Sequence, residues 1–168
     1  FKGITLNNCN KTFGGQLAID IEKFINNDTK QNINSFTYTL PSGRKILKPK
    51  TLSVFTKGSS GQSYGAFCND GMFLKHMGTC NDGVGKSMCG GEIIVKSPVK
   101  TNTRLKSNVL IGNFCLFGAT GGRLFVEGQA GDRFAVRNSG STAVVEGVGD
   151  YCAEYMTNGT ILNIGTYS

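Results

Sequence analysis

The chain has 168 residues, of which 24 are glycine and three proline, with no tryptophan and a formal net charge of +7. No apolar stretch approaches the roughly 20 residues that a membrane-spanning helix needs, and no signal peptide opens the sequence, so we expect no membrane partner. The positive charge gathers in two polar segments, 44–57 and 100–106, without the interleaved aromatic residues typical of nucleic-acid-binding modules. We therefore expect no nucleic-acid partner.

The first 57 residues differ from the rest of the chain and begin with a candidate helix. Leu17, Ile21, Phe24 and Ile25 recur at the spacing of one helix face, which predicts a helix over 12–25. A helix in this place, before the repeats described below, is expected to cover one end of the fold and protect exposed strand edges.

The remainder of this leading segment is polar and irregular. Residues 26–34 are rich in Asn, Asp, Lys and Gln and are expected to form a disordered loop. A strand is predicted over 36–40 and a turn at 41–43, followed by a basic stretch over 44–50. The apolar core is expected to resume at 52–55.

From residue 58 to the end, glycines introduce short apolar runs at a regular period. Five glycines taken as equivalent starts are separated by 20, 31, 18 and 19 residues, and a polar insertion over 98–108 accounts for the long interval. A period near 19 is the length of one coil of a parallel β-helix, whose coils must stack before any of them is stable. We expect one β-helix domain over 1–168, with glycine supplying positive φ at its corners. The predicted structural corner glycines are Gly71, Gly91, Gly122, Gly140 and Gly159.

Three of the apolar runs are especially clear. Residues 124–126, 134–136 and 143–145 are each bracketed by glycines or by a polar turn sequence. Each run is too short for a helix, and glycines this frequent would cost a helix roughly 1 kcal/mol each relative to alanine. We therefore predict a short strand at each of the three runs.

The cysteines and the one histidine do not have the spacing of a metal site. No Cys-x-x-Cys pair is present, and His76 is alone. We expect the thiols to pack as small apolar groups inside the coils, rather than to form disulfides or bind zinc, and His76 to lie in a strand. The cysteines are Cys9, Cys68, Cys80, Cys89, Cys115 and Cys152.

Residues 80–87 are one residue short of a phosphate-binding loop. That motif needs glycine where Cys80 stands, and a helix directly after Lys86 and Ser87. The sequence after Ser87 is a glycine corner followed by a strand pattern. We therefore expect no nucleotide site here.

Carboxylates recur in successive coils, and some β-helix enzymes that cleave acidic polysaccharides use such ladders. Arginines at 123, 133 and 137 are interspersed with them and would pair with them, so an ion-pair ladder is the favoured interpretation and an independent polysaccharide-acting enzyme the alternative. No Ser/His/Asp arrangement is evident, and we predict no catalytic, cofactor-binding or metal-binding residue in this chain. The carboxylates are Glu127, Asp132, Glu146, Asp150 and Glu154.

Long runs of the chain resemble the C-terminal domain of the large subunit of glutamate synthase. The matching runs keep their order and spacing and cover most of the chain apart from the Asn/Lys-rich stretch and the insertion. At 149–159 the chain departs from the family pattern at Tyr151, Cys152 and Asn158, which puts fine interface contacts there in question. The matching runs are 10–14, 61–67, 81–86, 90–95, 111–113, 118–122, 133–140, 143–147 and 154–157.

The resemblance implies an all-β, right-handed, single-stranded parallel β-helix with a structural task. Such enzymes are oxidoreductases that take the amide nitrogen of glutamine and make glutamate from 2-oxoglutarate. Their FMN, iron–sulfur cluster and NAD(P)H or ferredoxin belong with other domains, so no cofactor is expected in this chain. The implied partners are the glutaminase and FMN-binding synthase domains, and a second copy could pair with the truncated end. The expected compartment is the cytoplasm, with a plastid or another organelle as the alternative.

A second class of function stays open at this point. Related glycine-repeat domains serve as stand-alone subunits or interaction modules, as in formylmethanofuran dehydrogenase. The chain starts at Phe1 without an initiator methionine, which favours a piece of a larger polypeptide.

Overall fold

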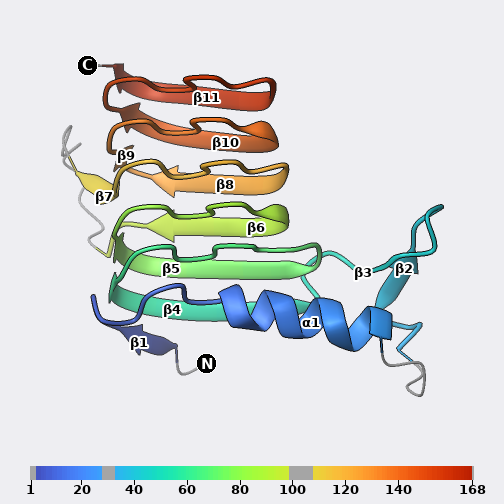
Figure 1. Cartoon of the computed structure of the whole chain (residues 1–168). Coiled ribbons are helices and arrows are strands. Elements are labelled where there is room, and N and C mark those ends of the chain that lie inside the picture. The colour runs from blue at the N-terminus through green and yellow to red at the C-terminus, as the bar shows by residue number, and fades with distance from the viewer. Residues whose placement is uncertain (1–2, 28–32, 99–107, 168) are drawn as a thin grey trace.

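The fold is a stack of parallel coils, as the glycine period predicts (Figure 1). The computed structural model describes residues 3–27, 33–98 and 108–167. Six long strands lie side by side in the order β4, β5, β6, β8, β10 and β11, and β1 extends the sheet beyond β4. The elements are β1 (Ile4–Leu6), α1 (Gly15–Asn27), β2 (Thr37–Thr39), β3 (Lys45–Leu47), β4 (Leu52–Ser60), β5 (Met72–Cys80), β6 (Cys89–Lys96), β7 (Val109–Ile111), β8 (Gly121–Glu127), β9 (Gln129–Ala130), β10 (Ser139–Val148) and β11 (Asn158–Tyr167).

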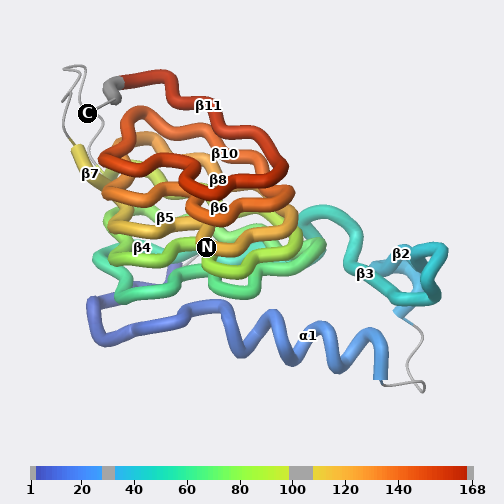
Figure 2. The backbone as a smooth tube through the Cα atoms, turned by 45° about the horizontal axis from the view of Figure 1, so that its top comes forward, coloured from blue at the N-terminus to red at the C-terminus, as the bar shows by residue number. Residues whose placement is uncertain are grey.

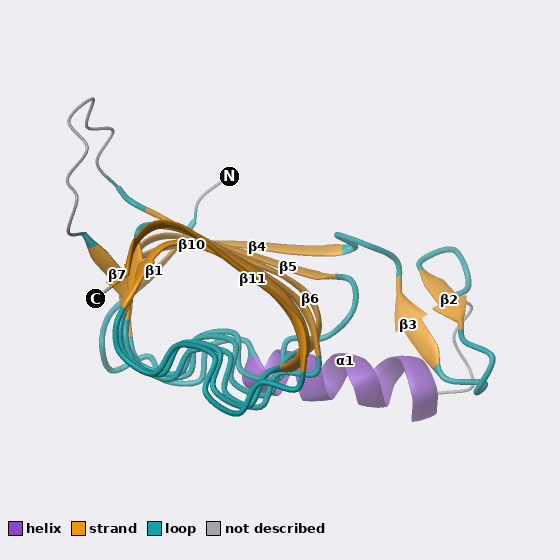
Figure 3. Cartoon of the chain, turned by 90° about the horizontal axis from the view of Figure 1, so that it is seen from above, coloured by secondary structure: helices purple, strands orange, loops and turns teal. Residues whose placement is uncertain are grey.

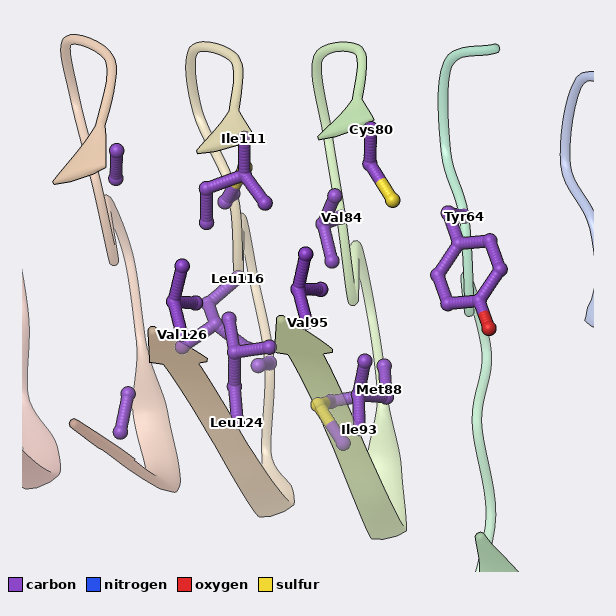
Figure 4. Close-up of a cluster of buried hydrophobic side chains, with 14 of the residues drawn as sticks. Tyr64, Cys80, Val84, Met88, Ile93, Val95, Ile111, Leu116, Leu124 and Val126 are labelled. Carbon is purple, nitrogen blue, oxygen red and sulfur yellow. The ribbon is translucent and has the colours of Figure 1, made fainter. Parts of the chain in front are cut away.

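Equivalent side chains of successive coils stack inside the solenoid. One inward row joins Leu74, Ile93, Leu124 and Ala143, each paired in register with the next and each fully buried. A second inward row joins Cys80, Ile111 and Ala130 through the short strands β7 and β9. Figure 4 shows side chains of these rows pointing into the space between the strands and the returning loop. Burial of these rows is the main source of stability, at roughly 25 cal/mol per Å² of apolar area.

The return path of each coil is a zigzag in which every second residue has positive φ. In the coil after β9 these residues are Arg133, Ala135 and Arg137, with φ of 56°, 61° and 54°. Their N–H groups point alternately along the stack: those of Arg133 and Arg137 donate to Asp150 and Glu154 in the following coil, and that of Ala135 donates to Cys115 in the preceding coil. Figure 2 shows these zigzags superimposed from coil to coil.

This zigzag corrects the expectation of a strand at 134–136. Phe134, Ala135 and Val136 are all buried, although a strand would turn the middle residue outward. The alternation of φ allows consecutive side chains to remain inside. A left-handed conformation costs a non-glycine residue about 1–2 kcal/mol, so the backbone hydrogen bonds to both neighbouring coils must offset that strain.

Four of the five predicted corner glycines have the expected backbone, and the fifth does not. Gly71, Gly91, Gly122 and Gly159 have φ between 75° and 101°. Gly140 is absent from the described residues with positive φ. Thr142 pairs with Arg123, so Ser141, and not Gly140, occupies the place that Gly122 has in the preceding coil. A Cβ at Gly140 would instead collide with the carbonyl oxygen of Thr120, so this position requires glycine for space.

The helix begins three residues later than predicted. Thr12 and Gly14 have φ of 53° and 89°, so they belong to the first zigzag and the helix can start only at Gly15. Leu17 and Ile21 pack against the core as expected, and Ile25 is buried. Phe24, which the spacing placed on the same face, is 43% exposed.

A small antiparallel hairpin lies between α1 and β4 in the chain. The predicted strand is β2, the predicted turn at 41–43 follows it, and the stretch interpreted only as basic contains β3, which pairs with β2. Figure 3, seen along the stack, shows this hairpin beyond the far end of α1. Residues 28–32 of the expected disordered loop and 99–107 of the insertion lie outside the described residues.

Candidate functional site

Three separate elements meet at a polar joint formed by Glu22, Arg44 and Asn69. Glu22 lies on α1, Arg44 follows the hairpin turn, and Asn69 lies at the corner before β5. The guanidinium of Arg44 donates to both carboxylate oxygens of Glu22 at 2.8 and 2.9 Å, and the Asn69 amide donates to Glu22 at 2.8 Å. The Arg44 hydrogen bonds lower the pKa of Glu22, so this carboxylate stays ionised and holds α1 and the hairpin against the solenoid.

Sequence reasoning missed the polar joint. In the sequence Arg44 belongs to the stretch interpreted only as basic, and no motif includes Asn69. Because 47 residues separate Glu22 from Asn69, no local spacing signals their contact. Only the folding of the leading segment back onto the first coils brings them together.

Beside the polar joint, a groove of about 360 Å³ runs between the hairpin and the starts of β5, β6 and β8. Its two cations, Lys50 and Arg123, both approach the Glu92 carboxylate, at 3.7 and 3.0 Å. Burial raises the pKa of Asp70 on the groove wall. The charges therefore largely neutralise one another, and among the described lining residues no nucleophile is paired with a base. The groove can take a side chain or small group but has no arrangement for catalysis.

The carboxylates expected to form a ladder serve several different contacts. Glu127 lies 3.6 Å from Lys96, Glu154 lies 4.0 Å from Arg133, and Glu146 is exposed. The ion pairs of the expected ladder are thus present only in part, since Arg123 pairs with Glu92.

Asp132 and Asp150 belong to a different ladder, which binds backbone. The side-chain oxygen of Asp82 accepts the N–H of Asn113 at 2.8 Å, that of Asn113 accepts the N–H of Asp132 at 2.9 Å, and that of Asp132 accepts the N–H of Asp150 at 3.0 Å. Within the described ranges no three His, Cys, Asp or Glu residues gather as metal ligands would. The carboxylates of Asp82 and Asp132 and the amide of Asn113 therefore link successive coils, and Asp150 takes part through its backbone N–H.

The stretch 80–87 uses its backbone N–H groups within the fold. The N–H groups of Gly83, Gly85 and Ser87 donate to Asn113, Tyr64 and Phe117 at 2.8–2.9 Å. The strand β6 follows, where a phosphate-binding loop needs a helix. Neither feature fits a phosphate group.

The thiols are divided between core and surface. Cys68, Cys80 and Cys115 are buried as expected, whereas Cys9 and Cys89 are exposed and Cys152 is half-buried. Burial raises the pKa of Cys68 and Cys115 to about 12, so both stay protonated at neutral pH. A protonated, separated thiol is neither an effective nucleophile nor a cluster ligand.

His76 lies in β5, as expected, within a buried polar chain. Its Nε2 lies 3.0 and 3.1 Å from the carbonyl oxygens of Gly58 and Thr79, which requires Nε2 to carry the proton. Nδ1 then accepts from the Thr56 hydroxyl at 2.8 Å, and Thr56 accepts from the Tyr64 hydroxyl at 2.9 Å. Burial lowers the pKa of His76 and keeps it neutral. Each group has its partner, so the chain is structural.

Comparison with known proteins gives a match along nearly the whole chain. A family model described as "GXGXG motif" matches residues 2–168. The ferredoxin-dependent glutamate synthase of Antithamnion sp. is 56% identical over 110 residues, 66% of this chain and 7% of that protein. The glutamate synthase [NADPH] large chain of Bacillus subtilis is 43% identical over 152 residues, 90% of this chain and 10% of that protein.

A chloroplastic relative belongs to the same group. The ferredoxin-dependent glutamate synthase 2 of Arabidopsis thaliana is 50% identical over 114 residues, 68% of this chain and 7% of that protein. The chain thus spans a tenth or less of the length of these curated relatives. Among the described helices, none is long and apolar enough to span a membrane.

Proposed function

Because the chain belongs to the GXGXG family, we propose that it is the C-terminal β-solenoid domain of a glutamate synthase large subunit, where its task is structural. The observation that carries the proposal is the match at 43–56% identity to chains named as glutamate synthases. The use of polar groups within the fold, in the polar joint and the backbone ladders, supports a scaffold without chemistry of its own. The stand-alone subunit is not favoured, because the relatives described above are far longer chains.

The proposed partners are the glutaminase and FMN-binding domains of the same polypeptide, which the solenoid would hold in position so that ammonia passes between them. The described residues do not fit the enzyme's cofactors: the buried thiols are separated and protonated, and the loop most like a phosphate cradle has its N–H groups occupied. FMN, the iron–sulfur cluster and the NAD(P)H or ferredoxin site are therefore assigned to other domains. The proposed compartment is the cytoplasm or a plastid.

A pair of substitutions in the full-length enzyme tests this scaffold role. Ala143→Asp places a charge in the fully buried row, and Thr157→Asp places the same charge at an exposed position. We expect Ala143→Asp to raise the glutamine hydrolysed per glutamate formed and Thr157→Asp to leave that ratio unchanged. An unchanged ratio in Ala143→Asp, with proteolysis showing that the solenoid has unfolded, would refute the scaffold role.

The size of the native polypeptide gives an independent test. An antibody raised against residues 1–168 should detect a band many times larger than 17.9 kDa in source cells. A band near 17.9 kDa would overturn the proposal of a multidomain parent. In that case a second copy, pairing with the outer edge of β11, becomes the first partner to examine.

A further inference from the structure

The outer face of the main sheet carries apolar side chains in register. Pairing places Ile94, Phe125, Val144 and Leu162 next to one another on β6, β8, β10 and β11. We call these four residues the apolar outer row. Leu162 is 52% exposed, and the other three are half-buried. A solvent-facing side of a sheet would carry polar residues at such positions.

Apolar residues also lie beyond the apolar outer row. Lys75 occupies the same register on β5 and interrupts the apolar side chains, and Phe55, 38% exposed, continues them on β4. Met77 and Ile164, 49% and 61% exposed, lie two residues further along their strands. The face therefore presents a patch that crosses several strands, at about 4.8 Å per strand. Soluble monomers rarely leave contiguous apolar patches of this kind exposed, and such patches mark interaction sites.

No described element of the chain covers the apolar outer row. In the view along the stack, α1 lies on the side of the returning loops, and the hairpin lies beyond the starts of the strands (Figure 3). The outer side of the long strands is free of other described elements. The groove described above opens beside this face, because Glu92 and Arg123 lie two residues before Ile94 and Phe125 on the same strands.

The charges around the patch indicate the chemistry of its partner. Within the described ranges, Lys57 on β4 and Lys75 on β5 have no carboxylate within 4 Å, whereas Lys96 is paired with Glu127. At the other end of the face, Glu146 lies two residues after Val144 on β10 and is exposed. On the β4 and β5 side of the row both charges, those of Lys57 and Lys75, are positive, and an apolar surface that carries carboxylates matches them.

We propose that the apolar outer row is the surface on which another domain of the same polypeptide docks, through apolar side chains and at least one carboxylate directed at Lys57 and Lys75. This inference rests on the proposed function. The partner is sought within the same polypeptide because nine-tenths or more of each relative described above lies outside the matched region. Contacts between domains of one chain commonly bury about 600–1,500 Å².

Cysteine labelling in the full-length enzyme tests the docking face without relying on activity. Leu162→Cys reports on the apolar outer row, and Thr157→Cys is a matched control at an exposed position in the same coil. We expect a maleimide to label Cys at 162 at least tenfold more slowly than Cys at 157, with peptide mass separating them from the native thiols. Complete labelling of both in urea gives the reference. Equal labelling of the two positions in the folded enzyme would overturn the proposal.

Dilution distinguishes a domain of the same polypeptide from a second copy of the protein as the occupant of this face. Protection by a domain of the same polypeptide does not change with protein concentration, so constant protection supports the proposal. Protection that disappears on dilution would show a contact between two copies and would overturn it.

A charge-reversal pair separates this inference from the scaffold role. Lys57→Glu and Lys75→Glu together should raise the glutamine hydrolysed per glutamate formed at least severalfold, while Lys86→Glu on the return path should not. If Ala143→Asp disrupts coupling but position 162 is freely labelled, the scaffold role stands and the docking face is wrong. If position 162 is protected but neither Ala143→Asp nor the lysine pair changes the glutamine hydrolysed per glutamate formed, another domain docks on this face and the scaffold role is wrong.

Discussion

Asn138 provides a direct test of how buried polar groups hold the corner before β10. Its side chain is fully buried; Oδ1 accepts from Ser141 N and Oγ at 2.9 Å each and from Gly140 N at 3.2 Å, and Nδ2 donates to Ser141 O at 3.0 Å. Asn138→Ala removes all four bonds. Leaving a buried polar group unsatisfied costs about 1–3 kcal/mol. Ser141 is also fully buried, so the variant leaves its N–H and its C=O unsatisfied. These two groups alone predict that the unfolding free energy falls by about 2–6 kcal/mol.

The matched control is Asn113→Ala. Asn113 is exposed, and its Oδ1 accepts one N–H, that of Asp132, at 2.9 Å. Water can replace that bond, so we expect a loss of about 1 kcal/mol or less. Urea unfolding of each variant, followed by far-ultraviolet circular dichroism, measures the difference in unfolding free energy. A loss in Asn138→Ala no larger than in Asn113→Ala would refute the assignment of these hydrogen bonds as a stabilising cluster.

Two further predictions concern backbone strain and pH. Gly122→Ala should destabilise the fold more than Gly118→Ala. Both glycines have positive φ, but a Cβ at 122 would lie 2.7 Å from Gly90 O, whereas a Cβ at 118 would meet only Ser87 Oγ at 4.0 Å. Equal urea midpoints for the two variants would contradict this prediction. Burial lowers the pKa of His76 in the folded state, so the unfolded chain, with a pKa near 6.5, binds a proton that the native state excludes. The contribution of His76 is therefore complete above about pH 6.5 and falls by up to about 1.4 kcal/mol per pH unit below it. His76→Gln should flatten this dependence, and identical pH slopes for the two proteins would show that His76 does not cause it.

The stacked fold could be predicted from the sequence because its period is regular. Glycine-led apolar runs near 19 residues apart indicated the coils, and the polar insertion explained the single long interval. The zigzag could not be predicted, because nothing in residues such as Arg133 or Ala135 signals positive φ. Their conformation is set by hydrogen bonds to residues 17 positions ahead and 20 positions back in the chain, which no local propensity reports.

The candidate site shows the same division between local and long-range information. Equal spacing suggested that carboxylates would stack, yet Asp132 bonds to backbone while Glu127 turns outward to Lys96. Glu127 is the last residue of β8, whereas Asp132 lies at the start of the return path, so the two carboxylates belong to different parts of the coil. The polar joint and the apolar outer row both needed tertiary structure, since each joins residues from separate coils or elements.

The two-way hydrogen bonding of the zigzag determines where the chain can change in length. Thirteen residues separate Ile111 from Leu124 and also Ala130 from Ala143, pairs that lie in register across two successive return paths. By contrast, six residues separate Leu124 from Ala130, but eighteen separate Ile93 from Ile111, where the polar insertion lies. An epitope tag or a foreign loop should therefore be accepted at the corner after β6. One added residue on a return path would displace every donor beyond it from its acceptors in both neighbouring coils.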